Sequence, residues 1–198
     1  MALLNANDSK PLHGGPSYSL GHRLFRAAWN TVWLLLASWT PAPLHRWRIG
    51  LLNLFGARVH ATAHVYGSAR VWYPPNLVME AGSCLAPGVR CYCMAPIHLG
   101  RHATVSQGAH LCAGMHDIED PEFQLVVKPI TLGANAWVAA EAFVGPGVCV
   151  GEAAVLGARA VLFKNAEPHG VYVGNPAVLV KHRSLLILKE ACDGERSY

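Results

Sequence analysis

The chain has 198 residues and a formal net charge of +4. Hydrophobic residues make up 52% of it and charged residues only 14%, a balance that excludes an intrinsically disordered protein. The basic residues gather in residues 23–48 and 164–183, without the dense Lys and Arg clusters of a nucleic-acid-binding surface. We therefore expect no nucleic acid among its partners.

The cysteines and the N-terminus predict a cytoplasmic protein with reduced thiols. The cysteines form no Cys-x-x-Cys pair and show no zinc-ligand spacing. They are Cys84, Cys91, Cys93, Cys112, Cys149 and Cys192. The N-terminus also lacks a basic segment followed by an apolar one, so no signal peptide is expected.

The N-terminal part of the chain reads as a tail followed by helices. Residues 1–16 are rich in Asn, Asp, Ser, Pro and Gly and are predicted to be disordered. Residues 17–57 form an N-terminal helical segment, with one helix over 18–39 and a short second one over 44–55. The first has a leucine-rich stripe beside an aromatic stripe of Phe25, Trp29 and Trp33, and prolines end it.

From residue 58 onward, an aliphatic residue recurs at every sixth position. The positions are Val59, Val65, Val71, Leu77 and, after a lapse at Ser83, Val89; then, after a four-residue slip, Leu99, Val105 and Leu111; and finally Leu132, Val138, Val144, Val150, Leu156 and Leu162. A period of six fits neither a helix nor an alternating strand. It fits a coil with three short faces, in which stacked coils bury the aliphatic residues in one column. Residues 58–177 are therefore predicted to form a β-solenoid, with 178–198 as its C-terminal cap and tail.

The repeat is interrupted by a loop at residues 112–131. Loops inserted into a solenoid lie outside the coils, where binding and catalysis commonly occur. The loop contains His116, whose imidazole could remove a proton from a hydroxyl group that attacks an acyl carbonyl. Asp117 and Glu122 are candidates to bond the other ring nitrogen and orient the ring. Because the chain has 11 histidines, position alone also allows His116 to be an ordinary surface residue.

Several segments resemble the hexapeptide-repeat acetyltransferases, and within them the colanic-acid-biosynthesis type that O-acetylates polysaccharide units. The likeness covers roughly residues 18–183. It is carried by WNTVWLLL (29–36), PLHRWRIGLLNLFGA (43–57), MAPIHLG (94–100), VSQGAHLCAGMHD (105–117), KPI (128–130), LGANAWVAAEAFVGPGV (132–148), LGARAV (156–161) and VYVGNPA (171–177). The resemblance implies a left-handed parallel β-helix that assembles as a homotrimer.

The resemblance also implies where each reactant binds. Acetyl-CoA would lie in the groove between neighbouring subunits as the cosubstrate, with His116 as the base and no metal ion. The pantetheine arm would run past small side chains, and basic residues late in the chain would meet the phosphates. These residues are Ala139, Ala140 and Ala158 for the arm, and Lys164, Lys181 and Arg183 for the phosphates.

Two further positions are mapped onto the acceptor site. Relatives commonly place an Asn, which can hydrogen-bond the acceptor sugar, where this chain has Cys93. Because a thiol replaces an amide poorly as a hydrogen-bond partner, this departure puts the acceptor in question. Trp137 either lines the acyl or acceptor pocket or packs between subunits. A second departure, Met115 where Ser or Thr is usual before the histidine, should leave proton transfer undisturbed.

Other functions remain open at this point. The same scaffold could acetylate a serine, an amino sugar or a xenobiotic. A non-catalytic or metal-binding solenoid is a third reading, which would need three histidines to converge; His98, His102 and His110 are the candidates, with no ligand spacing to support them.

The apolar part of the first helix, residues 27–39, is shorter than the roughly 20 residues that span a membrane. Arg23, Arg26, Arg46 and Arg48 flank it, and it contains tryptophans. Residues 20–39 therefore either lie at the inner membrane face as a peripheral contact, near a lipid-linked glycan acceptor, or pack against the base of the trimer.

Overall fold

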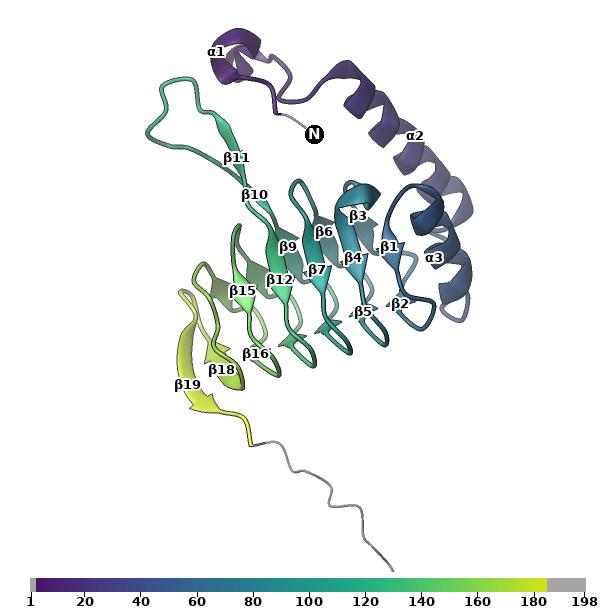
Figure 1. The fold of residues 1–198 in the computed structure, drawn as a ribbon, viewed down its shortest axis with the longest axis vertical. Helices are drawn as coiled ribbons and strands as arrows, with labels where there is room; N and C mark the ends of the chain where they lie inside the picture. Colours follow the sequence, from purple (N-terminus) through teal and green to yellow (C-terminus); the bar gives the residue numbers. More distant parts are fainter. Residues whose placement is uncertain (1–2, 185–198) are drawn as a thin grey trace, which may run out of the picture.

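The computed structural model describes residues 3–184, and its main body is a stack of coils with parallel strands on three faces (Figure 1). The predicted fold, a left-handed parallel β-helix, is confirmed. Face 1 contains β1 (Arg58–Val59), β4 (Leu77–Met79), β7 (Ile97–Leu99), β12 (Ile130–Leu132) and β15 (Cys149–Val150). Face 2 contains β2 (His64–Val65), β5 (Cys84–Leu85), β8 (Thr104–Val105), β13 (Trp137–Val138), β16 (Val155–Leu156), β18 (Gly170–Val173) and β19 (Val178–His182). Face 3 contains β3 (Arg70–Val71), β6 (Arg90–Tyr92), β9 (His110–Cys112), β14 (Phe143–Val144) and β17 (Val161–Leu162).

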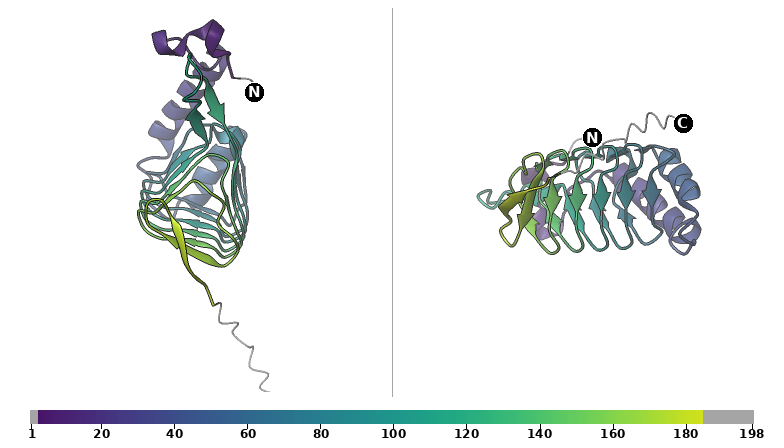
Figure 2. Two further views of the ribbon diagram at one scale, coloured as in Figure 1. Left: turned by 90° about the vertical axis from the view of Figure 1, so that its left-hand side faces the viewer. Right: turned by 90° about the horizontal axis from the view of Figure 1, so that it is seen from below.

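The chain visits the faces in the order 1, 2, 3, and turns at three corners, which we name 1–2, 2–3 and 3–1. Figure 2 shows the coils end-on and from below, stacked in sequence order. Within each short strand the outward residue is followed by an inward one, as in Arg58–Val59 and Trp137–Val138. The inward residues of successive coils contact one another in a single buried core.

The register corrects part of the predicted repeat. Val138 pairs with Leu156, a step of three hexads, whereas Val59 pairs with Met79, a step of three hexads and a further pair of residues. The early coils are therefore longer than the late ones. The single four-residue slip that was expected after Val89 does not occur at that point. The first extra pair lies near the 3-10 turn Pro74–Asn76, and Met79, not Leu77, is the partner of Val59.

Ser83, which looked like a lapse in the aliphatic series, occupies the small-residue position of its coil. It is fully buried, and its hydroxyl donates a hydrogen bond to the Glu80 carbonyl over 2.6 Å. The position suits Ser because the hydroxyl replaces apolar volume without leaving a polar atom unpaired.

The coils stack so closely at the corners that small residues are required there, and this requirement can be tested. A Cβ atom added to Gly133 would lie 2.6 Å from the Glu152 amide nitrogen in the next coil. We expect Gly133→Ala to lower the free energy of unfolding by about 1–3 kcal/mol, because backbone cannot move aside as a side chain can. Gly50→Ala is the matched control, since no atom lies within 4 Å of its added Cβ and Ala favours a helix. Equal thermal unfolding of the two variants would contradict this account of the corner.

Two helices cover the N-terminal end of the coil stack: α2 (Leu20–Leu36) and α3 (His45–Leu54). The aromatic stripe of α2 faces inward. The Trp29 indole donates to the Val71 carbonyl over 2.7 Å, and the Trp33 indole donates to the Gly67 carbonyl over 3.1 Å. In residues 3–184, no helix combines the length and the apolar character needed to cross a membrane.

The segment before α2 differs from the disordered tail predicted for residues 1–16. Residues 3–16 include α1 (Ala6–Ser9) and the 3-10 turn Pro11–His13, and they lie beside the inserted loop (Figure 1). Asn5 caps α1 by accepting a hydrogen bond from the Asn7 amide. Composition could not reveal this order, because the surface that the segment contacts belongs to a distant part of the sequence.

The C-terminal cap begins with β19, which pairs antiparallel with β18. It covers the edge that a parallel coil would otherwise leave open. The remainder of the predicted cap and tail, from residue 185 to 198 and including Cys192, lies outside the described residues.

Candidate active site

The interruption of the repeat folds as a β-hairpin at corner 3–1. Its strands are β10 (Gly114–His116) and β11 (Leu125–Val127), which pair antiparallel, with Met115 opposite Val126. The hairpin projects away from the coils and meets α1 at its outer end (Figures 1 and 2). A rigid coil on both sides and a paired ladder within it hold the residues of the hairpin in place.

The ring of His116 is held by Phe123, which lies in the hairpin loop just before β11. Its Nδ1 atom lies 2.7 Å from the Phe123 carbonyl oxygen, and the Phe123 ring stacks on the imidazole with centroids 4.3 Å apart and planes 8° from parallel. A carbonyl only accepts hydrogen bonds, so Nδ1 must carry the proton and donate it. The neutral ring then has its lone pair on Nε2, which is the form a general base requires.

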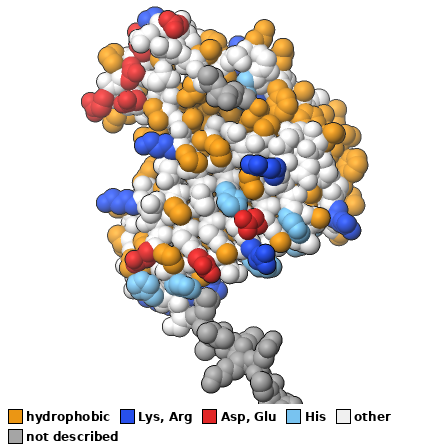
Figure 3. Space-filling view, in the orientation of Figure 1, with side chains coloured by type: hydrophobic (Ala, Val, Ile, Leu, Met, Phe, Trp, Pro, Cys, Tyr) orange, Lys and Arg blue, Asp and Glu red, His pale blue; other side chains and the backbone are white. Residues whose placement is uncertain are grey.

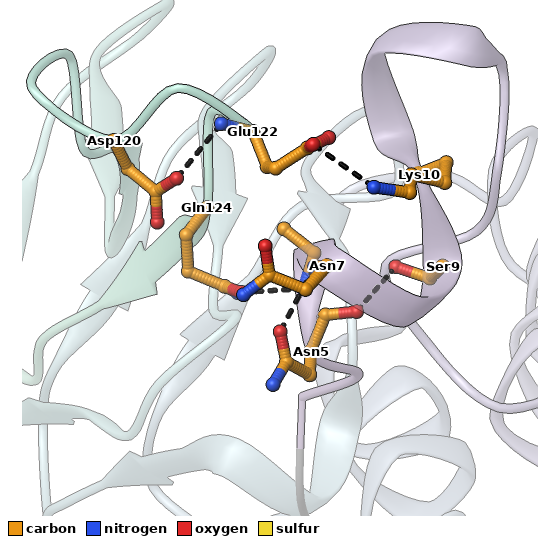
Figure 4. A network of polar contacts seen from close by, with 8 residues as sticks. Asn5, Asn7, Ser9, Lys10, Asp120, Glu122 and Gln124 are labelled. Carbon is orange, nitrogen blue, oxygen red and sulfur yellow. Dashed lines mark hydrogen bonds and ion pairs between the residues drawn. The ribbon is translucent and has the colours of Figure 1, made fainter.

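The two carboxylates predicted to orient this ring do not do so. Asp117 Oδ1 accepts a hydrogen bond from the Glu119 amide over 3.0 Å. Glu122 pairs with Lys10 over 2.9 Å and ties the hairpin to the N-terminal segment (Figure 4). The orienting group is a backbone carbonyl, which leaves no mark in a sequence, so closeness along the chain misled the prediction.

The N-terminal segment holds the hairpin by a second contact. The Ala6 amide donates to Gln124 Oε1 over 2.7 Å, beside the Lys10–Glu122 ion pair. Figure 4 shows both contacts joining the N-terminal segment to the hairpin loop before β11. The segment thus positions the hairpin on which His116 lies.

His116 lines a pocket of about 380 Å³, which we call the His116 pocket. The coils contribute Trp72, Tyr92 and Met94, and the hairpin also contributes Leu125. The segment before α2 contributes Gly14, Pro16, Ser17 and Tyr18, and α2 itself contributes Arg23 and Arg26. Sequence reasoning missed Tyr18, Trp72 and Tyr92, since neither an aromatic residue before a helix nor an outward one on a coil carries a signal that the two will meet.

Cys93 does not lie in this pocket, contrary to its predicted place in the acceptor site. The side chain is fully buried; its thiol donates to the Tyr73 carbonyl over 3.2 Å and accepts from the Tyr73 amide over 3.3 Å. The thiol therefore satisfies the backbone at a turn between coils and cannot contact an acceptor. Tyr92, the residue before it, does line the pocket.

The residues predicted to hold the cofactor do not converge within one chain. Ala139, Ala140 and Ala158 lie at corner 2–3 in successive coils, where the Arg159 amide donates to the Ala140 carbonyl over 2.9 Å. Lys164 follows β17 at corner 3–1, the corner of the hairpin. Lys181 lies in β19 on face 2.

Trp137 and Arg183 line a second, separate pocket of about 310 Å³ with His102 and Thr104. The Trp137 side chain is exposed, and its indole donates to the Ser106 hydroxyl over 2.9 Å. It lies on face 2, opposite the corner from which the hairpin projects. One chain alone thus does not bring Trp137 to His116.

The histidines considered as metal ligands lie on different parts of the β-helix. His98 is on face 1 and pairs with Glu80 over 2.9 Å, whereas His110 is on face 3 and His102 is at corner 1–2. Among the described residues, no group of three or more His, Cys, Asp or Glu side chains is placed to hold a metal ion.

Comparison with known proteins agrees with the fold and the motifs. No protein-family model matches the chain. Over 155 residues, 78% of this chain and 85% of the relative, it is 36% identical to the protein named colanic acid biosynthesis acetyltransferase WcaF of Escherichia coli K12. The structure of a maltose O-acetyltransferase from Clostridium difficile superposes with a TM-score of 0.72 at 20% identity, covering 84% of this chain and 90% of that one. A hexapeptide-repeat acetyltransferase from Vibrio cholerae, solved with acetyl coenzyme A, gives 0.72 at 17% identity, covering 91% and 100%. The chain therefore belongs to the hexapeptide-repeat acetyltransferases, in the family of the colanic acid biosynthesis acetyltransferase.

Proposed function

We propose that the protein transfers the acetyl group of acetyl-CoA to a hydroxyl of a sugar or polysaccharide unit, with His116 as the general base. The observation that carries the proposal is the state of the His116 ring. Nδ1 donates a hydrogen bond to the Phe123 carbonyl over 2.7 Å, and the ring lines a pocket large enough for a sugar unit. The relatives named for acetyl transfer, one of them solved with acetyl coenzyme A, support the cosubstrate.

The transfer would proceed directly, without a covalent enzyme intermediate. Nε2 of His116 takes the hydroxyl proton while the acceptor oxygen forms a bond to the acetyl carbonyl carbon. A backbone amide at a coil turn donates to the oxyanion. When the carbon–sulfur bond breaks, the coenzyme A thiolate leaves and receives the proton from the imidazolium. The Phe123 carbonyl stabilises the imidazolium by accepting from Nδ1 throughout.

The separation of the site residues supports a trimer. Ala139, Ala140 and Ala158 line one corner and the hairpin projects from another, so they can form one site only across a subunit boundary. In this arrangement acetyl-CoA lies between two β-helices, with its arm along the alanines. Lys164, Lys181 and Arg183 lie near its phosphates, and Trp137 lines the shared groove. Sedimentation equilibrium that gave a single chain would contradict the assembly.

Contact of residues 20–39 with a membrane surface stays a prediction. The exposed side of α2 carries Leu20, Leu24, Leu34 and Leu35, and hydrophobic side chains gather in that part of the molecule (Figure 3). Its aromatic side packs on the protein's own coils. Flotation with vesicles containing anionic lipid would test the contact, and wild-type protein that stays unbound would contradict it.

The function is tested by thiol release from acetyl-CoA across a panel of sugars and glycan repeat units. We expect release to depend on a sugar acceptor and the product to carry an O-acetyl ester. Release with serine, an amino sugar nitrogen or a xenobiotic, and with no sugar hydroxyl, would contradict the proposed acceptor class.

A further inference from the structure

Two arginines face the His116 pocket without a counter-charge. The ion pairs between described side chains include neither Arg23 nor Arg26. The Arg26 guanidinium carbon lies 4.0 Å from the centre of the Trp72 ring, which fixes the group against the pocket wall. Its Nε atom is buried and makes no hydrogen bond within the part of the chain that the structure describes. A guanidinium can only donate, so this group has an unmet need for an acceptor.

Tyr18, which also lines this pocket, carries a second unpaired donor. The residue is 8% exposed, and its buried hydroxyl has no hydrogen-bond partner among the described residues. The ring is held by His22, which stacks on it at 4.4 Å. Burial raises the pKa of Tyr18 to about 12, so at neutral pH the hydroxyl keeps its proton and can donate it.

Buried donors without partners are rare in folded proteins, and each one calls for an explanation, such as a water or an ion that binds there. Burial also lowers the pKa of Arg26, which means that its charge is held in a poorly solvated place. An anion would satisfy both conditions. Its oxygen atoms would accept hydrogen bonds from the guanidinium and the hydroxyl, and its negative charge would compensate the poorly solvated positive charge of Arg26.

We propose that the acceptor sugar carries an anionic group, a carboxylate or a phosphate, that binds Arg26, Arg23 and the Tyr18 hydroxyl while the hydroxyl to be acetylated faces His116. The proposal rests on the proposed function, because it takes the His116 pocket to be the acceptor site. It restricts the substrate class to uronic acids and phosphorylated sugars and makes neutral sugars poor acceptors.

The direct test is calorimetric binding, without acetyl-CoA, of three probes: glucuronic acid, glucose 1-phosphate and methyl glucoside. We expect at least one charged probe to bind about tenfold or more tightly than the neutral one, since each hydrogen bond to a charged group contributes on that order. The two charged probes distinguish the carboxylate from the phosphate. Equal affinity for all three probes would overturn the proposal.

Variants locate the effect. Arg26→Gln should weaken binding of the preferred charged probe about tenfold or more and leave the neutral probe unchanged. Arg23→Gln, at an exposed position, should weaken it in the same direction, and it keeps the test valid if Arg26→Gln does not fold. Arg46→Gln is the matched control, an exposed arginine on α3 that lines none of the pockets described above. Unchanged binding in both pocket variants would overturn the proposal.

Failure of this inference can be told from failure of the proposed function. If neutral sugars are acetylated as fast by Arg26→Gln as by the wild type, and charged ones no better, the function stands and the anion site is overturned. If charged probes bind through Arg26 but no sugar is acetylated, the anion site stands and the proposed function is wrong.

Discussion

Replacing His116 by Ala is expected to lower kcat by about a hundredfold or more, since a positioned general base contributes roughly 10²–10⁴-fold to a proton-transfer step. Of the described residues that line the His116 pocket, His116 alone carries an imidazole, and its ring is fixed by Phe123. The side chain lies on a hairpin outside the core, so its removal should leave the thermal unfolding transition unchanged. Thiol release under saturating acetyl-CoA measures the effect.

Two matched variants separate this mechanism from one in which a carboxylate accepts the hydrogen bond from Nδ1 of His116. Asp117→Asn and Glu122→Gln should each keep kcat within about threefold of the wild type, because the Phe123 carbonyl, not either carboxylate, accepts from Nδ1. A large loss of kcat in either variant with the fold intact would restore the carboxylate as the orienting group. Turnover that survives His116→Ala would remove His116 from the mechanism altogether.

Arg48→Ala is expected to give the largest loss of stability of any single arginine change. Arg48 is fully buried in α3. Its Nε donates to the Val65 carbonyl over 2.6 Å, and its two terminal nitrogens donate to the carbonyls of Ala42 over 2.6 Å and Pro41 over 3.0 Å. It also donates to the Thr40 hydroxyl over 2.7 Å. One guanidinium thus joins the turn between α2 and α3 to the first coil.

Truncating this fully buried side chain removes all of these hydrogen bonds at once, which should cost about 3 kcal/mol or more of the free energy of unfolding. The same change at Arg46, exposed on the same helix, should cost no more than about 0.5 kcal/mol. Thermal and denaturant unfolding of the two variants measure the difference. Equal stability of both would show that the buried network is dispensable.

This role also changes how the N-terminal arginines are understood. In the sequence, Arg48 looked like one of four basic residues flanking an apolar helix at a membrane interface. In the structure it points inward, and Arg26 lies against Trp72 at the His116 pocket. Only Arg23 and Arg46 of this group are exposed. Spacing along a helix shows which side chains share a face, but it does not show what that face meets.

The sequence by itself determined the β-helix, because the repeat is local. An inward aliphatic residue at every sixth position, as in the run from Leu132 to Leu162, leaves a three-faced coil as the arrangement that buries the whole series. It also located the interruption that carries His116, because a break in a strict period is visible without knowing where the break leads. The extensions of the early coils were misplaced because Leu77 and Val89 are buried too, so hydrophobicity did not distinguish the two frames.

The tertiary structure alone decided how the site is built. The group that accepts the hydrogen bond from His116 is the Phe123 carbonyl. Because every residue type has the same backbone carbonyl, the sequence does not reveal this contact. The His116 pocket joins α2 to coils that follow much later in the sequence, and the N-terminal segment is ordered by a hairpin that is more distant still. Such contacts depend on where a helix crosses a solenoid, which rests on packing between distant segments and not on any periodicity along the chain.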